Sequence, residues 1–138
     1  MNGILAYESY TDARKHLKNV LDTAEQGRPV LVQREDSRLA VVDAERLRLA
    51  LGKSCRRPAV VYEAGGCSVF LPGVPVAADG ADLDDAIEEM VTALREYAQD
   101  WQDRVGDAPN HRSNWGLVQL VALSDDVQLK EWLVGSDS

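Results

Sequence analysis

Residues 82–101, DLDDAIEEMVTALREYAQDW, contain the longest helix pattern in this chain of 138 residues. Apolar residues recur at intervals of three or four from Leu83 to Trp101, which is the spacing of one face of an α-helix. The expected first turn is rich in aspartates, which the helix dipole favours there, at positions 82, 84 and 85. Because so long an apolar stripe must pack against other elements, the pattern predicts an ordered domain around this helix.

The segments on both sides of this helix supply partners for it. Residues 59–62 and 68–71 are β-rich runs joined by a glycine pair, and residues 76–78 are a third short strand candidate. Beyond the helix, residues 117–123 are predicted as a further strand, and Ser124 as the cap of a last short helix that ends near Leu133. Trp115 and Trp132 are expected to add apolar area to the core. Residues 59–138 are therefore predicted to form a small α+β domain.

The N-terminal part is predicted to be a separate β-α-β-β-α unit. Residues 4–7 are a strand candidate, and a helix capped by Thr11 follows and ends at Gly27. Residues 30–33 and 39–42 are predicted to form a hairpin around the polar stretch 34–38. Asp43 is expected to cap a second helix over 44–51, closed by Gly52. The fold class is therefore α+β throughout.

Charge divides the chain in the same place as this pattern. Residues 1–58 hold eleven basic and eight acidic residues, whereas residues 59–138 hold four basic and fifteen acidic residues. We predict a first domain at 1–52, a basic linker at 53–58 and an acidic domain at 59–138. Such asymmetry indicates two surfaces with different partners, although acidic helices that only keep the protein in solution explain the charge equally well.

Composition narrows the class of protein. With 45% hydrophobic and 28% charged residues, the chain is expected to fold. It has no apolar run near the ~20 residues that span a bilayer, and residues 1–13 lack the pattern of a signal peptide. Two cysteines are too few for the disulfide framework of a small secreted protein. We therefore expect a cytoplasmic protein that does not associate with membranes.

No motif predicts catalysis, a cofactor or a metal. Gly52-Lys53-Ser54 resembles the end of a phosphate-binding loop, but that loop needs a glycine at position 47, where this chain has leucine. The two histidines, His16 and His111, do not share metal-ligand spacing with either cysteine. The carboxylates at positions 84, 85, 88 and 89 have the spacing of a solvated helix face. The sequence therefore predicts a binding protein and not an enzyme, with no cofactor and no metal.

Basic residues in the first domain form a candidate nucleic-acid surface. They belong to the first helix and to the hairpin: Arg14, Lys15, Lys18, Arg34 and Arg38. Arginine and lysine supply phosphate contacts, and arginine also reads guanine edges. The alternative is an ordinary mixed surface, because acidic residues are interspersed. A symmetric dimer would double the phosphate contacts, and affinity rises steeply with their number.

Residues 4–51 resemble the Phd/YefM family of antitoxins. The resemblance rests on Tyr10-Thr11-Asp12-Ala13-Arg14-Lys15-His16-Leu17, on Pro29-Val30-Leu31-Val32-Gln33-Arg34, and on Leu39-Ala40-Val41-Val42 followed by Asp43-Ala44-Glu45-Arg46-Leu47. It implies a homodimer that binds operator DNA through Arg14, Lys15 and Arg34. Glu35-Asp36 departs from the family, whose loop is usually basic or contains glycine.

Residues 59–105 resemble the small HicB-type antitoxin domain. The matching segments are Val60-Val61-Tyr62-Glu63, Phe70-Leu71-Pro72-Gly73-Val74-Pro75 and Gly80-Ala81-Asp82-Leu83-Asp84-Asp85-Ala86. This resemblance implies a hairpin, a connection broken by prolines and a capped amphipathic helix. An unrelated α+β domain can show the same order of elements.

Together these features predict the antitoxin of a type II toxin–antitoxin system. Such a protein neutralises a RelE/ParE-type or other RNA-targeting toxin by direct binding and represses its own operon. The predicted partners are the cognate toxin, operator DNA and a second copy of the chain. The acidic half suits a basic toxin. The alternative is a stand-alone transcriptional regulator whose C-terminal domain senses a small molecule or only assembles oligomers.

Overall fold

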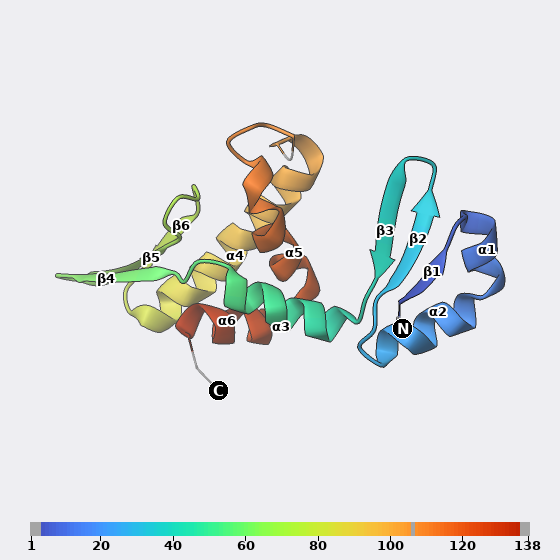
Figure 1. Cartoon of the computed structure of the whole chain (residues 1–138). Coiled ribbons are helices and arrows are strands. Elements are labelled where there is room, and N and C mark those ends of the chain that lie inside the picture. The colour runs from blue at the N-terminus through green and yellow to red at the C-terminus, as the bar shows by residue number, and fades with distance from the viewer. Residues whose placement is uncertain (1–3, 106, 136–138) are drawn as a thin grey trace. The chain divides into compact units, whose positions relative to one another are not determined.

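A computed structural model describes residues 4–105 and 107–135 of the chain. Within these residues the fold is mixed α+β, with two three-stranded sheets and six α-helices (Figure 1), so the predicted class is confirmed. The chain divides into two compact units, residues 1–47 and residues 48–138. We call them the N-terminal unit and the C-terminal unit. Their boundary lies inside a helix, between Leu47 and Arg48, whereas the sequence places it in the linker 53–58.

The N-terminal unit is a small sheet with two short helices. Its elements are β1 (Leu5–Tyr7), α1 (Tyr10–Lys15), α2 (Leu17–Glu25), β2 (Val30–Arg34) and β3 (Ser37–Val41), followed by the start of α3 (Ala44–Ser54). The sheet has the order β1-β2-β3. Strand β1 pairs with β2 in parallel, and β2 pairs with β3 in antiparallel.

The helix predicted after Thr11 is in fact two helices, and its cap is a different residue. Ser9 accepts a hydrogen bond from the backbone amide of Asp12 at 3.1 Å and begins α1. His16 leaves helical geometry at φ −117° and ψ 31°, which separates α1 from α2. Its ring stacks on Tyr7 of β1 with ring centroids 5.5 Å apart. The apolar period continued through His16, so the sequence did not show this break.

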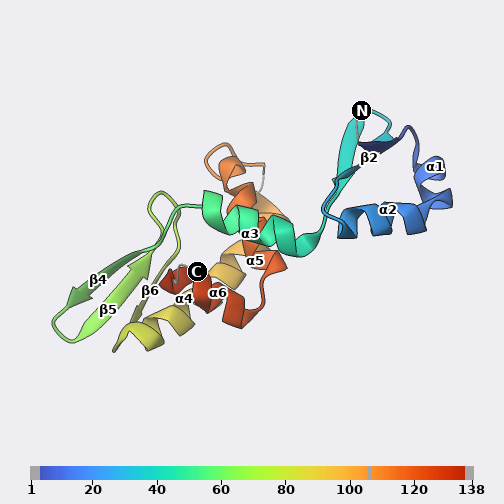
Figure 2. The same ribbon diagram turned by 60° about the horizontal axis from the view of Figure 1, so that its bottom comes forward.

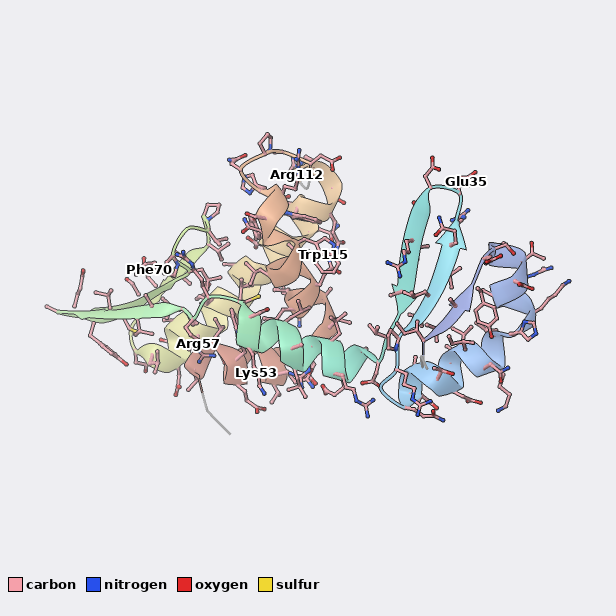
Figure 3. All side chains as sticks on the ribbon, viewed as in Figure 1. Glu35, Lys53, Arg57, Phe70, Arg112 and Trp115 are labelled. Atoms are coloured by element: carbon pink, nitrogen blue, oxygen red, sulfur yellow. The ribbon has the colours of Figure 1, made fainter. Side chains whose placement is uncertain are left out.

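The β2–β3 hairpin is tighter than the sequence predicted. Arg34 and Ser37 are paired, so only Glu35 and Asp36 form the turn, and not residues 34–38. Glu35 has φ 53°, a left-handed conformation that tight hairpin turns require. Figure 3 shows Glu35 at the tip of the hairpin.

The C-terminal unit contains the larger sheet and most of the helices. After α3 it has β4 (Ala59–Glu63), β5 (Gly66–Phe70) and β6 (Ala77–Gly80), then the long helix α4 (Leu83–Asp100). A π-helical turn (Trp101–Val105) and a 3-10 turn (Arg112–Asn114) precede α5 (Trp115–Leu123) and α6 (Asp126–Val134). The sheet is antiparallel with the order β4-β5-β6. The predicted strands near 59–62, 68–71 and 76–78 and the predicted long helix are confirmed, with Asp82 as its N-cap.

The core of this unit lies between the sheet and the helices. Helix α4 packs on β5 and β6, and α5 and α6 pack on α4. The apolar stripe of α4 predicted from the sequence is buried at Ala86, Ile87, Met90, Val91, Leu94 and Ala98. Arg95 joins the three helices, because its guanidinium donates to the carbonyl oxygens of Val121 at 2.7 Å and Ser124 at 2.9 Å and pairs with Asp126.

The predicted strand over residues 117–123 is wrong, because these residues form α5. Leu117, Val118, Leu120 and Val121 are buried there. A short run that is apolar on every side fits a buried strand and a buried helix equally well, and only its packing decides between them.

Three smaller predictions in this unit are also wrong. Helix α3 does not end at Gly52 but continues to Ser54. The carbonyl oxygen of Gly52 accepts a hydrogen bond from Trp132 Nε1 at 3.0 Å. Asp125, and not Ser124, caps α6 through a capping box with Gln128, while Ser124 bonds back to the Leu120 carbonyl. Trp115 is 52% exposed and adds little to the core. Trp132, in contrast, packs against the core as predicted.

Candidate functional site

The five predicted DNA-contacting residues are all exposed in the N-terminal unit. Arg14 and Lys15 lie in the last turn of α1, and Lys18 lies in the first turn of α2. Because His16 breaks the helix between them, Lys18 does not continue the face of α1 that carries Arg14. Lys18 is also bound internally, since its Nζ lies 2.7 Å from Asp22. The hydrogen bond and the charge of Asp22 raise the pKa of Lys18 above its ordinary value.

The two hairpin arginines point to opposite faces of the sheet. In the β2–β3 register, Arg38 is paired with Gln33, whereas Arg34 is paired with Ser37. Paired residues point to one face, and neighbours along a strand alternate between faces. Arg34 therefore shares the face of Val30 and Val32, and Arg38 lies on the other face. The structure thus brings Arg14 and Lys15 together on α1 and does not gather all five residues on one face.

The N-terminal unit buries few apolar side chains. Only Val20, Ala24 and Val30 are buried among its described residues. Six large apolar side chains are exposed instead: Ile4, Tyr10, Leu17, Leu21, Leu39 and Val42. On α2, one side of the apolar stripe is buried at Val20 and Ala24, and the other side is exposed at Leu17 and Leu21. A unit of this kind has an apolar surface that a partner can cover.

The C-terminal unit carries an open cleft of about 470 Å³ between the end of α3, the segment after β5 and the start of α5. Polar and apolar groups line it together, among them Cys55, Arg56, Leu71 and Asn114. Cys55 is half-buried, and this burial raises the pKa of its thiol. The thiol is therefore poorly ionised at neutral pH, which argues against a reactive nucleophile here.

A hydrogen-bonded cluster holds the loop before α5 on α4. The Tyr97 hydroxyl lies 2.9 Å from His111 Nδ1 and accepts a hydrogen bond from Asn114 at 2.8 Å. Trp101 Nε1 donates to the His111 carbonyl oxygen at 2.9 Å. These three hydrogen bonds fix the loop, which explains the arrangement of the cluster.

The described residues contain neither a metal-ion site nor a membrane-spanning helix. No group of three or more histidine, cysteine, aspartate or glutamate side chains in residues 4–105 and 107–135 is arranged to hold a metal ion. In the same part of the chain, none of the helices combines the length and the apolar character of a membrane span.

Comparison with known proteins identifies the family. The PHD-like family, described as the antitoxin of RelE/RelB toxin–antitoxin systems, matches residues 4–134. The chain therefore belongs to this antitoxin family. A crystal structure of the antitoxin part of a proposed toxin/antitoxin system from Syntrophomonas wolfei subsp. wolfei has the same fold, with a TM-score of 0.76 and 20% sequence identity over 96% of each chain. Comparison with curated protein sequences gave no match.

Sequence reasoning missed one surface that the structure makes plain. It treated residues 59–62 only as a strand of the core, but Val60, Val61 and Tyr62 are exposed. The lack of alternation between apolar and polar residues in this strand was the available signal, because a strand with one face in water usually alternates.

Proposed function

We propose that this antitoxin acts by direct binding, with the C-terminal unit on a RelE/ParE-type or other RNA-targeting toxin and the N-terminal unit on operator DNA as a homodimer. The observation that carries the proposal is the match to an antitoxin family over residues 4–134, because membership implies a cognate toxin. In this proposal the N-terminal unit is of the Phd/YefM kind and the sheet with α4 is of the HicB kind. The order β4-β5-β6-α4 is consistent with the second resemblance.

The half-covered apolar stripe of α2 supports homodimerisation. A segment of fewer than ~60 residues is marginally stable alone, and this unit leaves Leu17 and Leu21 in water beside its small core. Because each leucine is already about half covered, its burial in a symmetric dimer is worth about half of the ~1.5–3 kcal/mol for full burial, in each copy. The same dimer would present Arg14 and Lys15 twice, at the two half-sites of an operator.

The charge of residues 59–138 supports capture of a basic toxin. Fifteen acidic and four basic residues lie in this segment, and six of the carboxylates lie on the exposed face of α4. Toxins that cleave RNA or bind ribosomes need basic surfaces. An acidic surface attracts such a protein and repels nucleic acid. We therefore assign no operator contact to residues 59–138.

The open cleft favours one alternative function. A cavity of about 470 Å³ is of the size that small ligands occupy, so a stand-alone regulator could sense a metabolite there. The two functions differ in one measurement. The antitoxin, purified together with the product of the neighbouring gene, should form a stable complex, whereas a stand-alone regulator should not.

The operator assignment is tested by Arg14→Ala in the full chain, titrated against the DNA upstream of its own gene at several salt concentrations. Loss of a base-edge contact should weaken binding by about 1–3 kcal/mol, and loss of a phosphate contact should mainly flatten the salt dependence. Lys53→Ala is the matched control, because Lys53 is an exposed cation outside the N-terminal unit (Figure 3). Equal curves for Arg14→Ala and Lys53→Ala would contradict the DNA-binding role of Arg14.

A further inference from the structure

Strand β4 is the uncovered edge of the larger sheet. The sheet order is β4-β5-β6, so both β4 and β6 have one side without a neighbouring strand in the described residues. Helix α4 packs on β5 and β6, and the first turn of α4 crowds Gly80 at the end of β6. Figure 2 shows β4 at the side of the sheet opposite the start of α4. Of the two edge strands, β6 packs against α4, and β4 is the one that lies farther from this helix.

The side chains of β4 are apolar on both faces. Val60 and Tyr62 are paired with Val69 and Cys67, so they point to the face that α4 covers, yet they remain 38% and 69% exposed. Val61 is paired with Ser68 and shares the opposite face with the exposed Phe70 (Figure 3). Edge strands are usually protected by charged residues, proline or a covering helix. Within β4 only Glu63, at its end, is charged.

The charge around this edge selects its partner. Residues 59–94 contain no lysine, arginine or histidine and seven carboxylates. Glu63 and Asp79 lie on the same face as Val61 and Phe70, since Asp79 is paired with Ser68. Among the described residues, this acidic segment forms a salt bridge with Lys130, whose Nζ lies 3.4 Å from Oε1 of Glu88. Glu88 belongs to α4 and not to β4. A second copy would bring the carboxylates of two such sheets together, whereas a basic protein would meet opposite charge at Glu63, at the end of the apolar strand, and at Asp79 on the same face of the sheet.

We propose that β4 is the docking edge for the cognate toxin, with a strand of that basic protein pairing along residues 59–63 and extending the sheet. Backbone hydrogen bonds would give affinity, and contacts of Val61, Tyr62 and Phe70 with the added strand would give specificity. Lysines and arginines flanking the toxin strand would meet Glu63 and Asp79. This inference rests on the proposed function and goes further by placing the toxin on one strand.

The test compares four full-length variants with the parent chain, each titrated with the purified product of the neighbouring gene. Tyr62→Lys and Val61→Lys put a cation into the edge, and Tyr62→Phe preserves the apolar contact. Val127→Lys is the control, because Val127 is an exposed valine on α6, outside the sheet. We expect the two edge variants to bind on the order of 30-fold more weakly, and Tyr62→Phe and Val127→Lys to bind as the parent chain does.

Backbone amide exchange of the parent chain gives a second readout that does not depend on the stability of a variant. In the complex, exchange within residues 59–63 should slow by at least about tenfold, while exchange within α6 should stay unchanged. If the complex forms but edge variants bind normally and β4 is not protected, the docking edge is refuted while the antitoxin function stands. If the parent chain does not bind the gene product, the proposed function fails and the inference fails with it. If the lysine variants abolish self-association instead, β4 is an interface between copies and the inference is overturned.

Discussion

The two units of this chain bury their apolar residues to very different extents. Of the nineteen buried apolar side chains in the described residues, three lie in the N-terminal unit and sixteen in the C-terminal unit. The N-terminal unit nevertheless exposes six large apolar side chains. We therefore expect the C-terminal unit to be stabilised by its own core, and we propose that the N-terminal unit depends on association. In the proposed function, toxin binding then falls to the self-sufficient unit and operator binding to the associating one.

The largest effect is expected from charge placed in the exposed stripe of α2. Leu21→Glu should weaken dimerisation on the order of 100-fold, because a symmetric interface loses two buried leucines and gains two buried carboxylates. Sedimentation velocity over a dilution series measures this. Leu49→Glu is the control, since Leu49 is as exposed as Leu21 but lies in the C-terminal unit. A monomeric parent chain at micromolar concentration, or equal effects of both variants, would contradict the contrast between the units.

A core truncation in the C-terminal unit should destabilise this unit equally at every protein concentration. Leu94 is fully buried in α4, so Leu94→Ala should lower the free energy of unfolding of this unit by about 2–5 kcal/mol. Thermal unfolding followed by tryptophan fluorescence reports on it, because all three tryptophans lie in this unit. The shift in Tm should be the same at low and high protein concentration. A shift that grows on dilution would mean that the C-terminal unit also depends on association.

The contact of Arg95 with α5 and α6 should have a smaller but measurable effect. Arg95→Ala removes donors from two carbonyl oxygens at the end of α5 and should cost about 1–3 kcal/mol. Arg104→Ala is a matched control, because Arg104 makes only an exposed pair with Asp100 at 2.8 Å within one helical segment. Denaturant titration of both variants compares them. Equal midpoints would show that Arg95 does not tie the helices together.

The local patterns of the sequence predicted much of this fold. The period from Leu83 to Trp101 and the aspartates at 82, 84 and 85 located α4 and its buried face, because periodicity and charge near a helix start are properties of the chain itself. The strand predicted at 117–123 was wrong because that run carries no period, and its helical form follows from packing on α4. The break at His16 was missed because it depends on contact with Tyr7 of another element.

The candidate sites were less predictable than the fold. The five basic residues were identified by type, and all are exposed, but the separation of Arg34 from Arg38 depends on the turn at Glu35 and Asp36. A one-residue change in hairpin register reverses which face each arginine takes. The free edge of β4 depends on which strands α4 covers, and that arrangement is tertiary.

The smallest expected effect concerns the thiol of Cys55, and it tests whether the C-terminal unit is independent of the N-terminal unit. Burial raises the pKa of Cys55, so the thiolate that reacts with iodoacetamide is scarcer in the folded protein than in the unfolded chain. Folded protein should therefore be alkylated more slowly than protein in denaturant, and the rate should keep rising at pH values where the unfolded chain has reached its maximum. Since the raised pKa belongs to the folded state, its contribution to stability is complete below the pKa of the unfolded thiol and declines as the pH rises above it.

Cys67 is 3% exposed and should stay unreacted until the unit unfolds, so mass spectrometry of the two cysteines separates local access from unfolding. Dilution that dissociates the N-terminal units should leave the Cys55 rate unchanged. A rate that rises on dilution would show that the packing around Cys55 depends on the dimer, and the division between a self-sufficient and an associating unit would then be wrong.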